Sequence, residues 1–132
     1  MLGFLALQTM SALDMISSAD GTTDQYAQFK CPGCGYNHCL GVGPKAVGPV
    51  WRWNANKIRP TFTPSVLAQG LKQTFNEHGH WDGGWEKDSE GKPIPFTCHS
   101  FVTDGRIQFL SDCTHALAGQ TVNLSDFPRG EA

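Results

Sequence analysis

Short runs in which apolar and polar residues alternate, separated by glycine and proline, cover most of the chain. The clearest pair is 96–102 and 107–110, which lie on either side of Asp104-Gly105. Alternation with a period of two is typical of half-buried β-strands, and Asp-Gly between two such runs is a strong signal for a tight hairpin. The pattern therefore predicts an antiparallel hairpin at the centre of a mainly β protein.

Other extended segments are predicted on both sides of this hairpin. Pro60 and Pro64 exclude a helix between them, because proline lacks a backbone donor and restricts the residue before it. Residues 76–95 combine histidines and tryptophans with several glycines and charged residues, so we expect a long exposed loop or flap there. Residues 114–119 suit one helical turn that stops at Gly119. The expected architecture is a small antiparallel sheet or open barrel-like domain, with further strands at 25–30, 50–53, 61–67, 70–75 and 120–124.

The first sixteen residues form an apolar segment that has no basic residue before it and is interrupted by Asp14. A signal peptide needs a basic start and a membrane span needs about 20 apolar residues, so neither is expected. Leu2, Leu5, Leu13 and Ile16 share a helical face, which predicts a short amphipathic helix. We therefore expect an N-terminal extension over 1–24 and a single β domain over 25–132.

Composition narrows the class of protein. The chain has 132 residues, of which 39% are hydrophobic and 17% charged, values typical of one globular domain. The net charge of −2 does not favour nucleic-acid binding, because domains dedicated to that task are usually basic. Five cysteines are an odd number, which a secreted disulfide framework would not normally use. We expect a reducing cytoplasm, without membrane association.

Cys31-Pro32-Gly33-Cys34 is the strongest chemical motif in the sequence. A Cys-x-x-Cys turn presents two thiolates to one cation, and tetrahedral zinc then needs two further ligands. A redox role is disfavoured because the βαβ context of such motifs is missing. The remaining ligands are expected from the region that runs from Cys98 to His115.

The geometry of the predicted hairpin sorts these ligands, because side chains alternate between the two faces of a strand. Cys98, Ser111 and Cys113 should share one face, and His99, Leu110 and Asp112 the other. We therefore expect a structural Zn²⁺ held by four cysteines, with His115 as the alternative to the fourth and with His38 and Cys39 as weaker candidates. The four are Cys31, Cys34, Cys98 and Cys113.

Several of these segments together resemble a family of small phage and prophage proteins known as domain of unknown function 6527, some of which carry the misleading label ammonia monooxygenase. The resemblance covers residues 29–127, and its most specific part is the block from Asp104 to Gln120. It implies a relation to a peptidase of bacterial ubiquitin-like conjugation operons. The resembling segments are Lys30–Cys34 with His38, Trp51–Asn54, Pro60–Ser65, Cys98–Val102 and Asp104–Gln120.

A peptidase requires a nucleophile, a base and a group that orients the base. His99 and Asp112 are expected on the same face of the hairpin, and Ser65 lies in a stiff extended segment after Pro64. Ser65, His99 and Asp112 would then form a serine-type triad, with Ser100 as the alternative nucleophile and His115 as the alternative base. Each residue also has a structural interpretation: Ser65 could support a turn, His99 could sit beside the metal site, and Asp112 could cap the turn after it.

Two other functions remain open. The protein could be a zinc-binding β module by which a phage binds a host protein without turnover. Alternatively, the zinc could act directly, with His99 or His115 as a ligand and a bound water as the nucleophile. The expected partner is accordingly a protein or peptide substrate, or a host protein, in the cytoplasm of the host if the chain is phage-encoded.

Overall fold

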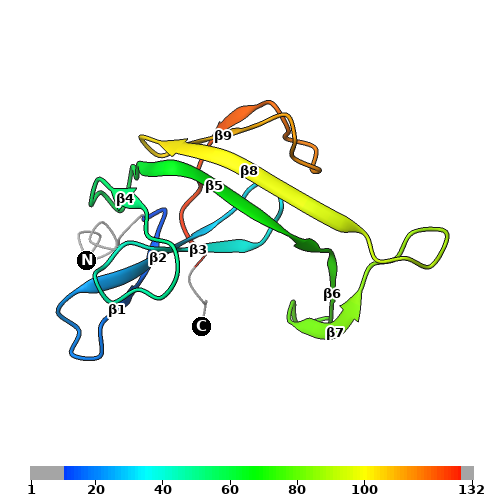
Figure 1. Ribbon diagram of the computed structural model, residues 1–132, viewed down its shortest axis with the longest axis horizontal. Coiled ribbons are helices and arrows are strands. Elements are labelled where there is room, and N and C mark those ends of the chain that lie inside the picture. The colour runs from blue at the N-terminus through cyan, green and yellow to red at the C-terminus, as the bar shows by residue number, and fades with distance from the viewer. Residues whose placement is uncertain (1–10, 129–132) are drawn as a thin grey trace, which may run out of the picture.

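The computed structural model describes residues 11–128, which form ten β-strands and contain no α-helix (Figure 1). The strands assemble into a three-stranded sheet of order β1-β2-β3, a five-stranded sheet of order β10-β9-β8-β5-β4 and a β6-β7 hairpin, and all named pairs are antiparallel. The mainly β fold predicted from the alternating pattern is confirmed. The bounds are β1 Asp14–Ser17, β2 Asp24–Lys30, β3 Asn37–Gly41, β4 Arg52–Trp53, β5 Phe62–Leu71, β6 Gln73–Phe75, β7 Trp81–Trp85, β8 Pro95–Thr103, β9 Arg106–Phe109 and β10 Thr121–Asn123.

The core lies between the three-stranded and the five-stranded sheet. Figure 1 shows the first, coloured blue to cyan, crossing beneath the second, coloured green to orange. Every second side chain of β2 is buried, as expected for a strand with one face on the core. The ring of Phe29 stacks on Phe62 of the opposite sheet at 6.5 Å between centroids. The largest fully buried side chains are Phe29, Phe109, Leu13, Leu40, Ile107 and Val102.

The β8–β9 hairpin forms at the predicted Asp104-Gly105 turn. Both residues have positive φ, 51° and 76°, as a tight turn that matches the twist of the strands requires. Val102 pairs with Ile107, as predicted, and the ladder continues to the pair of Ser100 and Phe109. Beyond that pair the chain leaves the strand, so the hairpin is shorter than the sequence suggested.

Two expectations about where strands form are wrong. Asp14–Ser17, the end of the expected N-terminal helix, is strand β1, because pairing with β2 outweighs the helical spacing of its apolar residues; residues 1–10 lie outside the described part. The expected loop 76–95 contains β7, which pairs with β6. The rings of Trp81 and Trp85 contact each other at 5.1 Å between centroids and contribute to this hairpin. The division of the chain at residue 24 stays a prediction.

Residues 114–119 form hydrogen-bonded turns instead of a helical turn. Ala118 N–H donates to the His115 carbonyl at 3.3 Å, and Gln120 N–H donates to the Leu117 carbonyl at 2.9 Å. Gly119 has φ +79° and reverses the chain, as the predicted stop signal requires. The turns lead the chain back into β10, the strand next to β9.

Candidate functional site

Strand β8 presents chemically different side chains on its two faces. Cys98 and Ser100 point into the protein and are each 1% exposed, whereas Phe101 on the other face is 43% exposed. His99 lies between Cys98 and Ser100 in sequence, and therefore on the face of Phe101, because successive side chains of a strand alternate. One strand thus separates an inner group of cysteines from an outer group that contains an imidazole.

On the outer face, the imidazole of His99 lies between a hydroxyl and a carboxylate. Its Nε2 is 3.1 Å from Ser65 Oγ, and its Nδ1 is 3.1 Å from Asp112 Oδ2. The His99 side chain is 25% exposed and that of Asp112 is 55% exposed, so the group is open to a ligand. A carboxylate on Nδ1 leaves Nε2 free to accept the hydroxyl proton, which is the arrangement that activates a serine for attack.

Ser65 is positioned by an irregular stretch of β5. The pairing of β5 with β8 is interrupted between Phe62 and Val66, and Ser65 lies at the end of this bulge. From there on the strands are in register, with Leu67 opposite His99, so Ser65 is diagonal to His99 on the same face. The indole Nε1 of Trp51 donates to the Ser65 carbonyl at 3.1 Å and anchors the backbone from the other side.

Asp112 is positioned by the segment 110–115, which is tied to the backbone of β8. Leu110 N–H donates to the His99 carbonyl at 2.9 Å, and Thr114 N–H donates to the Thr97 carbonyl at 2.9 Å. Between them, the sulfur of Cys113 accepts the His99 N–H at 3.2 Å, and its thiol donates to the His99 carbonyl at 3.2 Å. Asp112 is thereby held beside the imidazole with which it pairs.

On the inner face, three cysteines and one histidine converge. Cys31 Sγ is 3.6 Å from Cys98 Sγ, and Cys34 Sγ is 3.4 Å from His38 Nε2. The four donor atoms lie within 4.8 Å of one another, close enough to share one metal ion. Three thiolates and one imidazole are an established ligand set for tetrahedral zinc. The site would clamp the β2–β3 hairpin onto β8.

The electrostatics of this group without an ion also favour a cation. The hydrogen bond from Cys34, followed by that from Cys98, holds the pKa of Cys31 far below its usual range. The hydrogen bonds to Cys31 and Cys34 raise the pKa of Cys98 far above its usual range. Burial alone would lower the pKa of His38, but hydrogen bonds to the same two cysteines outweigh it and raise the pKa to about 9. One negative charge is already stabilised here, and further thiolates would need a positive ion.

A second group overlaps the first and consists of Cys98, Cys113 and His115. His115 Nε2 lies 3.5 Å from Cys98 Sγ, while its Nδ1 accepts the Leu117 N–H at 3.2 Å. A neutral imidazole that accepts at Nδ1 carries its proton on Nε2, so His115 is set to donate to the sulfur of Cys98. Its ring packs edge-on against Phe109 at 4.5 Å between centroids.

The structure thus brings together Ser65, His99 and Asp112, and separately Cys31, Cys34 and Cys98. Cys113 is outside the four-donor group. Its fourth member is His38, which the sequence had ranked lower as crowded against the Cys-x-x-Cys turn. The signal that would have found His38 is its place on a strand directly after that turn. In the structure its side chain is 7% exposed and points inward.

The alternative site residues lie away from the outer group. The Ser100 hydroxyl is buried and has no hydrogen-bond partner among the described residues, on the face opposite His99. The ring of His115 reaches into the Cys-x-x-Cys turn, since a Cβ on Gly33 would clash with its Cε1. Because its Nδ1 and Nε2 both have partners inside the protein, His115 is poorly placed to act as a base on the outer face.

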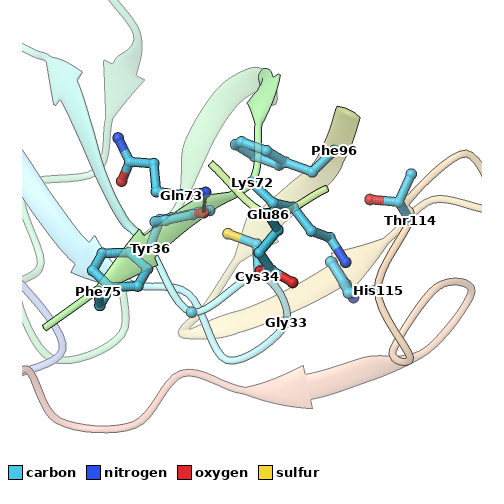
Figure 2. Close-up of a pocket in the computed structure, with 11 residues that line it drawn as sticks. Gly33, Cys34, Tyr36, Lys72, Gln73, Phe75, Glu86, Phe96, Thr114 and His115 are labelled. Carbon is cyan, nitrogen blue, oxygen red and sulfur yellow. Dashed lines mark hydrogen bonds between the residues drawn. The ribbon is translucent and has the colours of Figure 1, made fainter. Parts of the chain in front are cut away.

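A cavity of about 340 Å³ opens beside the Cys-x-x-Cys turn. Figure 2 shows Tyr36 and Phe75 at one end of this cavity and Thr114 and His115 at the other, with Cys34 between them. Tyr36 packs on Phe96 at 5.0 Å between ring centroids, which gives the cavity an aromatic wall. Cys34 is therefore the member of the Cys/His group that lies closest to solvent.

The fold and the site define a small all-β protein that carries a serine–histidine–aspartate arrangement on one face of a sheet and a Cys/His cluster on the other. The model of one family, described as bacterial ubiquitination-like system serine protease (BubE), matches residues 6–110. The chain belongs to this family. The match includes Ser65 and His99 and ends shortly before Asp112.

Neither the comparison with curated proteins nor the comparison with solved structures gives a match. Among the described residues, no helix is long and apolar enough to cross a membrane.

Proposed function

We propose that the chain is a serine-type peptidase that hydrolyses a protein or a ubiquitin-like tail, with Ser65 as nucleophile, His99 as base and Asp112 as the group that orients the base. The single observation that carries the proposal is the continuous hydrogen-bonded path from Ser65 Oγ through the His99 ring to Asp112 Oδ2, with 3.1 Å at each step. Membership of the BubE family supports the same reaction class.

The reaction follows from this path. Ser65 Oγ attacks the scissile carbonyl carbon while its proton passes to His99 Nε2, and Asp112 stabilises the imidazolium that results. His99 then returns the proton to the leaving amine, the carbon–nitrogen bond breaks, and the acyl group remains on Ser65. Water, deprotonated by His99, hydrolyses this ester and restores the hydroxyl.

We further propose that Cys31, Cys34, His38 and Cys98 hold a structural Zn²⁺. The donor set, its burial and its mutual distances fit that ion. Four protein donors complete a tetrahedron, whereas zinc that activates water keeps an open position, so direct metal catalysis is the weaker alternative. Thiolate ligands suit a reducing compartment, and the cytoplasm of a bacterium or of a phage host is the proposed location.

The experiment that tests the catalytic centre is labelling with a fluorophosphonate, which reacts with activated serines. We expect stoichiometric modification of Ser65, identified by peptide mass, and none in Ser65→Ala. Ser111→Ala is the matched control, because Ser111 is an exposed serine that lies outside the hydrogen-bonded path from Ser65 to Asp112. Labelling that survives in Ser65→Ala, or is absent from the native chain, would overturn the proposed mechanism.

A further inference from the structure

Strand β5 has one edge that is largely unpaired. Its first edge pairs with β8 along almost the whole strand, but its second edge pairs only with the two-residue strand β4, at Phe62 and Thr63. In the described part of the chain, no strand pairs with the second edge from Ser65 to Leu71. Figure 1 shows β4 covering only the start of β5. The open edge therefore begins at the residue proposed as nucleophile.

The backbone groups along this edge can be assigned to a side. Residues 66–71 all lie opposite β8, and Lys72 N–H continues that register by donating to the Ile94 carbonyl at 2.8 Å. The even-numbered residues 66, 68 and 70 therefore direct their N–H and C=O groups toward β8. The Ser65 carbonyl points the other way, toward the Trp51 indole. Since N–H and C=O of one residue point to the same side and successive residues alternate, Leu67, Gln69 and Leu71 direct both groups to the open edge.

Beyond the bulge that ends at Ser65, this edge lacks the features that usually protect an edge strand. Natural proteins place charged residues, proline or a covering segment on exposed edges, but 66–71 contains neither a charge nor a proline. The side chain of Leu67 is 52% exposed and that of Leu71 is 40% exposed. The edge ends at a second cavity of about 310 Å³, which is lined by Gln69, Leu71, Tyr36 and Trp85 among others.

We propose that this edge is the substrate-binding track: an extended segment of the substrate adds to β5 as an antiparallel strand and delivers its carbonyl to Ser65. Antiparallel pairing, the more stable arrangement, makes the segment run from Leu71 toward Ser65, so the residues before the scissile bond lie along the edge. The track ends at Ser65, because the Ser65 carbonyl already accepts a hydrogen bond from the Trp51 indole. The proposal rests on the proposed function, because Ser65 defines where the scissile bond lies.

This geometry also specifies the substrate class. Main-chain hydrogen bonds to Leu67, Gln69 and Leu71 require a segment without internal structure, such as a flexible protein tail, and not a helix. The second cavity lies about four residues, or ~13 Å, from Ser65 along the strand. A bulky side chain about four residues before the scissile bond would therefore reach Trp85 and Tyr36.

The test uses a diphenyl phosphonate attached to the carboxyl end of a tetra-alanine peptide, and hydrogen exchange of single amides by NMR. In the free protein, the amides of Leu67 and Gln69 should exchange fast and those of Val66 and Ala68 slowly. After the probe has modified Ser65, we expect exchange at Leu67 and Gln69 to slow at least tenfold. The same probe with N-methylated amides, which cannot pair, should leave both fast.

A pair of variants tests the track on the enzyme side. Gln69→Pro removes one open-edge N–H without breaking the ladder with β8, and it should slow modification by the peptidyl phosphonate at least tenfold. Gln69→Ala keeps the backbone donor and should react within twofold of the native rate. The readout for each variant is the rate of the peptidyl phosphonate divided by the rate of a fluorophosphonate without a peptide, so that any general effect on Ser65 cancels.

The outcomes separate this inference from the function on which it rests. Absence of any Ser65 modification would overturn the proposed function and, with it, the track. Modification of Ser65 with unchanged exchange at Leu67 and Gln69 would overturn the track alone. Exchange of these amides could instead be slow without a probe and become slower as the protein concentration increases. This result would show that a second copy of the chain occupies the edge, and it would also overturn the track.

Discussion

The inner and outer faces of β8 differ in burial and in the number of elements that they join. The inner face holds Cys98, 1% exposed, in a group whose donors come from the Cys-x-x-Cys turn, β3 and β8. The outer face holds His99, whose side chain is 25% exposed, with partners from β5 and from the segment after β9. The inner face is therefore suited to holding the two sheets together, whereas the outer face is open to a ligand.

The comparison also shows how one strand supports both tasks. Cys98 and His99 are consecutive residues of β8, but alternation places Cys98 in the protein interior and His99 on the side that faces solvent. A change on one face should therefore leave the other intact unless it moves the strand. The following predictions test this separation, from the largest expected effect to the smallest.

Loss of the metal should have the largest effect. Structural zinc contributes about 10 kcal/mol or more to folding in small domains, and this ion would join both sheets. Cys31→Ser, or incubation with a strong chelator, should abolish the cooperative thermal transition or lower Tm by more than about 10 °C. Cys39→Ser, at an exposed cysteine outside the group, is the matched control and should leave Tm unchanged. A Cys31→Ser protein with native Tm and full zinc content would remove the structural role.

Removal of the nucleophile should abolish activity but leave thermal stability nearly unchanged, the opposite of what loss of the metal should do to stability. Ser65→Ala should lower kcat by roughly 10⁴- to 10⁶-fold, by analogy with serine-protease triads, with little change in Tm because Ser65 is only half-buried. The measurement is cleavage of an internally quenched peptide mixture, together with zinc analysis. If Tm fell as far as activity, the two faces would not be independent.

Asp112→Asn should lower kcat by about 10³- to 10⁴-fold, since an amide can stabilise the wrong tautomer of His99 and cannot stabilise its charged form. KM, zinc content and Tm should remain close to native, because Asp112 is more than half exposed. Asp126→Asn, at another exposed aspartate, provides the control. If kcat of Asp112→Asn were native, the carboxylate would have a structural role in the following turn and no role in catalysis.

Cys113→Ala distinguishes a metal ligand from a backbone partner. The contacts of Cys113 with the His99 backbone predict a loss of about 1 kcal/mol of stability and a moderate fall in kcat, with zinc content unchanged. A fall in zinc content measured by mass spectrometry would instead show that Cys113 is a metal ligand.

Trp51→Phe should have the smallest effect. It removes the indole hydrogen bond to the Ser65 carbonyl, a contribution of about 1 kcal/mol, while an aromatic ring remains. We expect a fall in kcat of several fold at constant zinc content. Trp81→Phe, in the β6–β7 hairpin, should leave kcat unchanged. An equal effect of both variants would point to general loss of packing.

The sequence predicted those parts of the molecule that depend on local rules. Asp104-Gly105 set the hairpin turn, and alternation along β8 correctly separated Cys98 from His99. The convergence of Ser65 with His99 needed the register between β5 and β8, which sequence alone does not contain. His38 was expected to be crowded against the Cys-x-x-Cys turn, whereas the strand after that turn directs its side chain toward the cysteines.

The segments that were mispredicted depend on long-range pairing. Strand β1 takes its conformation from β2, and β7 from β6, so neither carries a strong signal of its own. Glycines at 83 and 84 also conceal the alternation of β7. Cys113 lies near Cys98, as the alternation predicted, but it belongs to the group of Cys98 and His115 and not to the four-donor group. The chain leaves the ladder after Phe109, so alternation along the hairpin could not give its exact position.

The alternation along β8 has a consequence for the kinds of mutation that this protein can tolerate. A single-residue insertion or deletion in the strand would turn the imidazole toward the core and the thiol toward water, and would impair folding and chemistry together. A point substitution can change either folding or chemistry, whereas a one-residue shift of the strand changes both. Length variation among related proteins should therefore collect outside Pro95–Thr103, in the turns between strands.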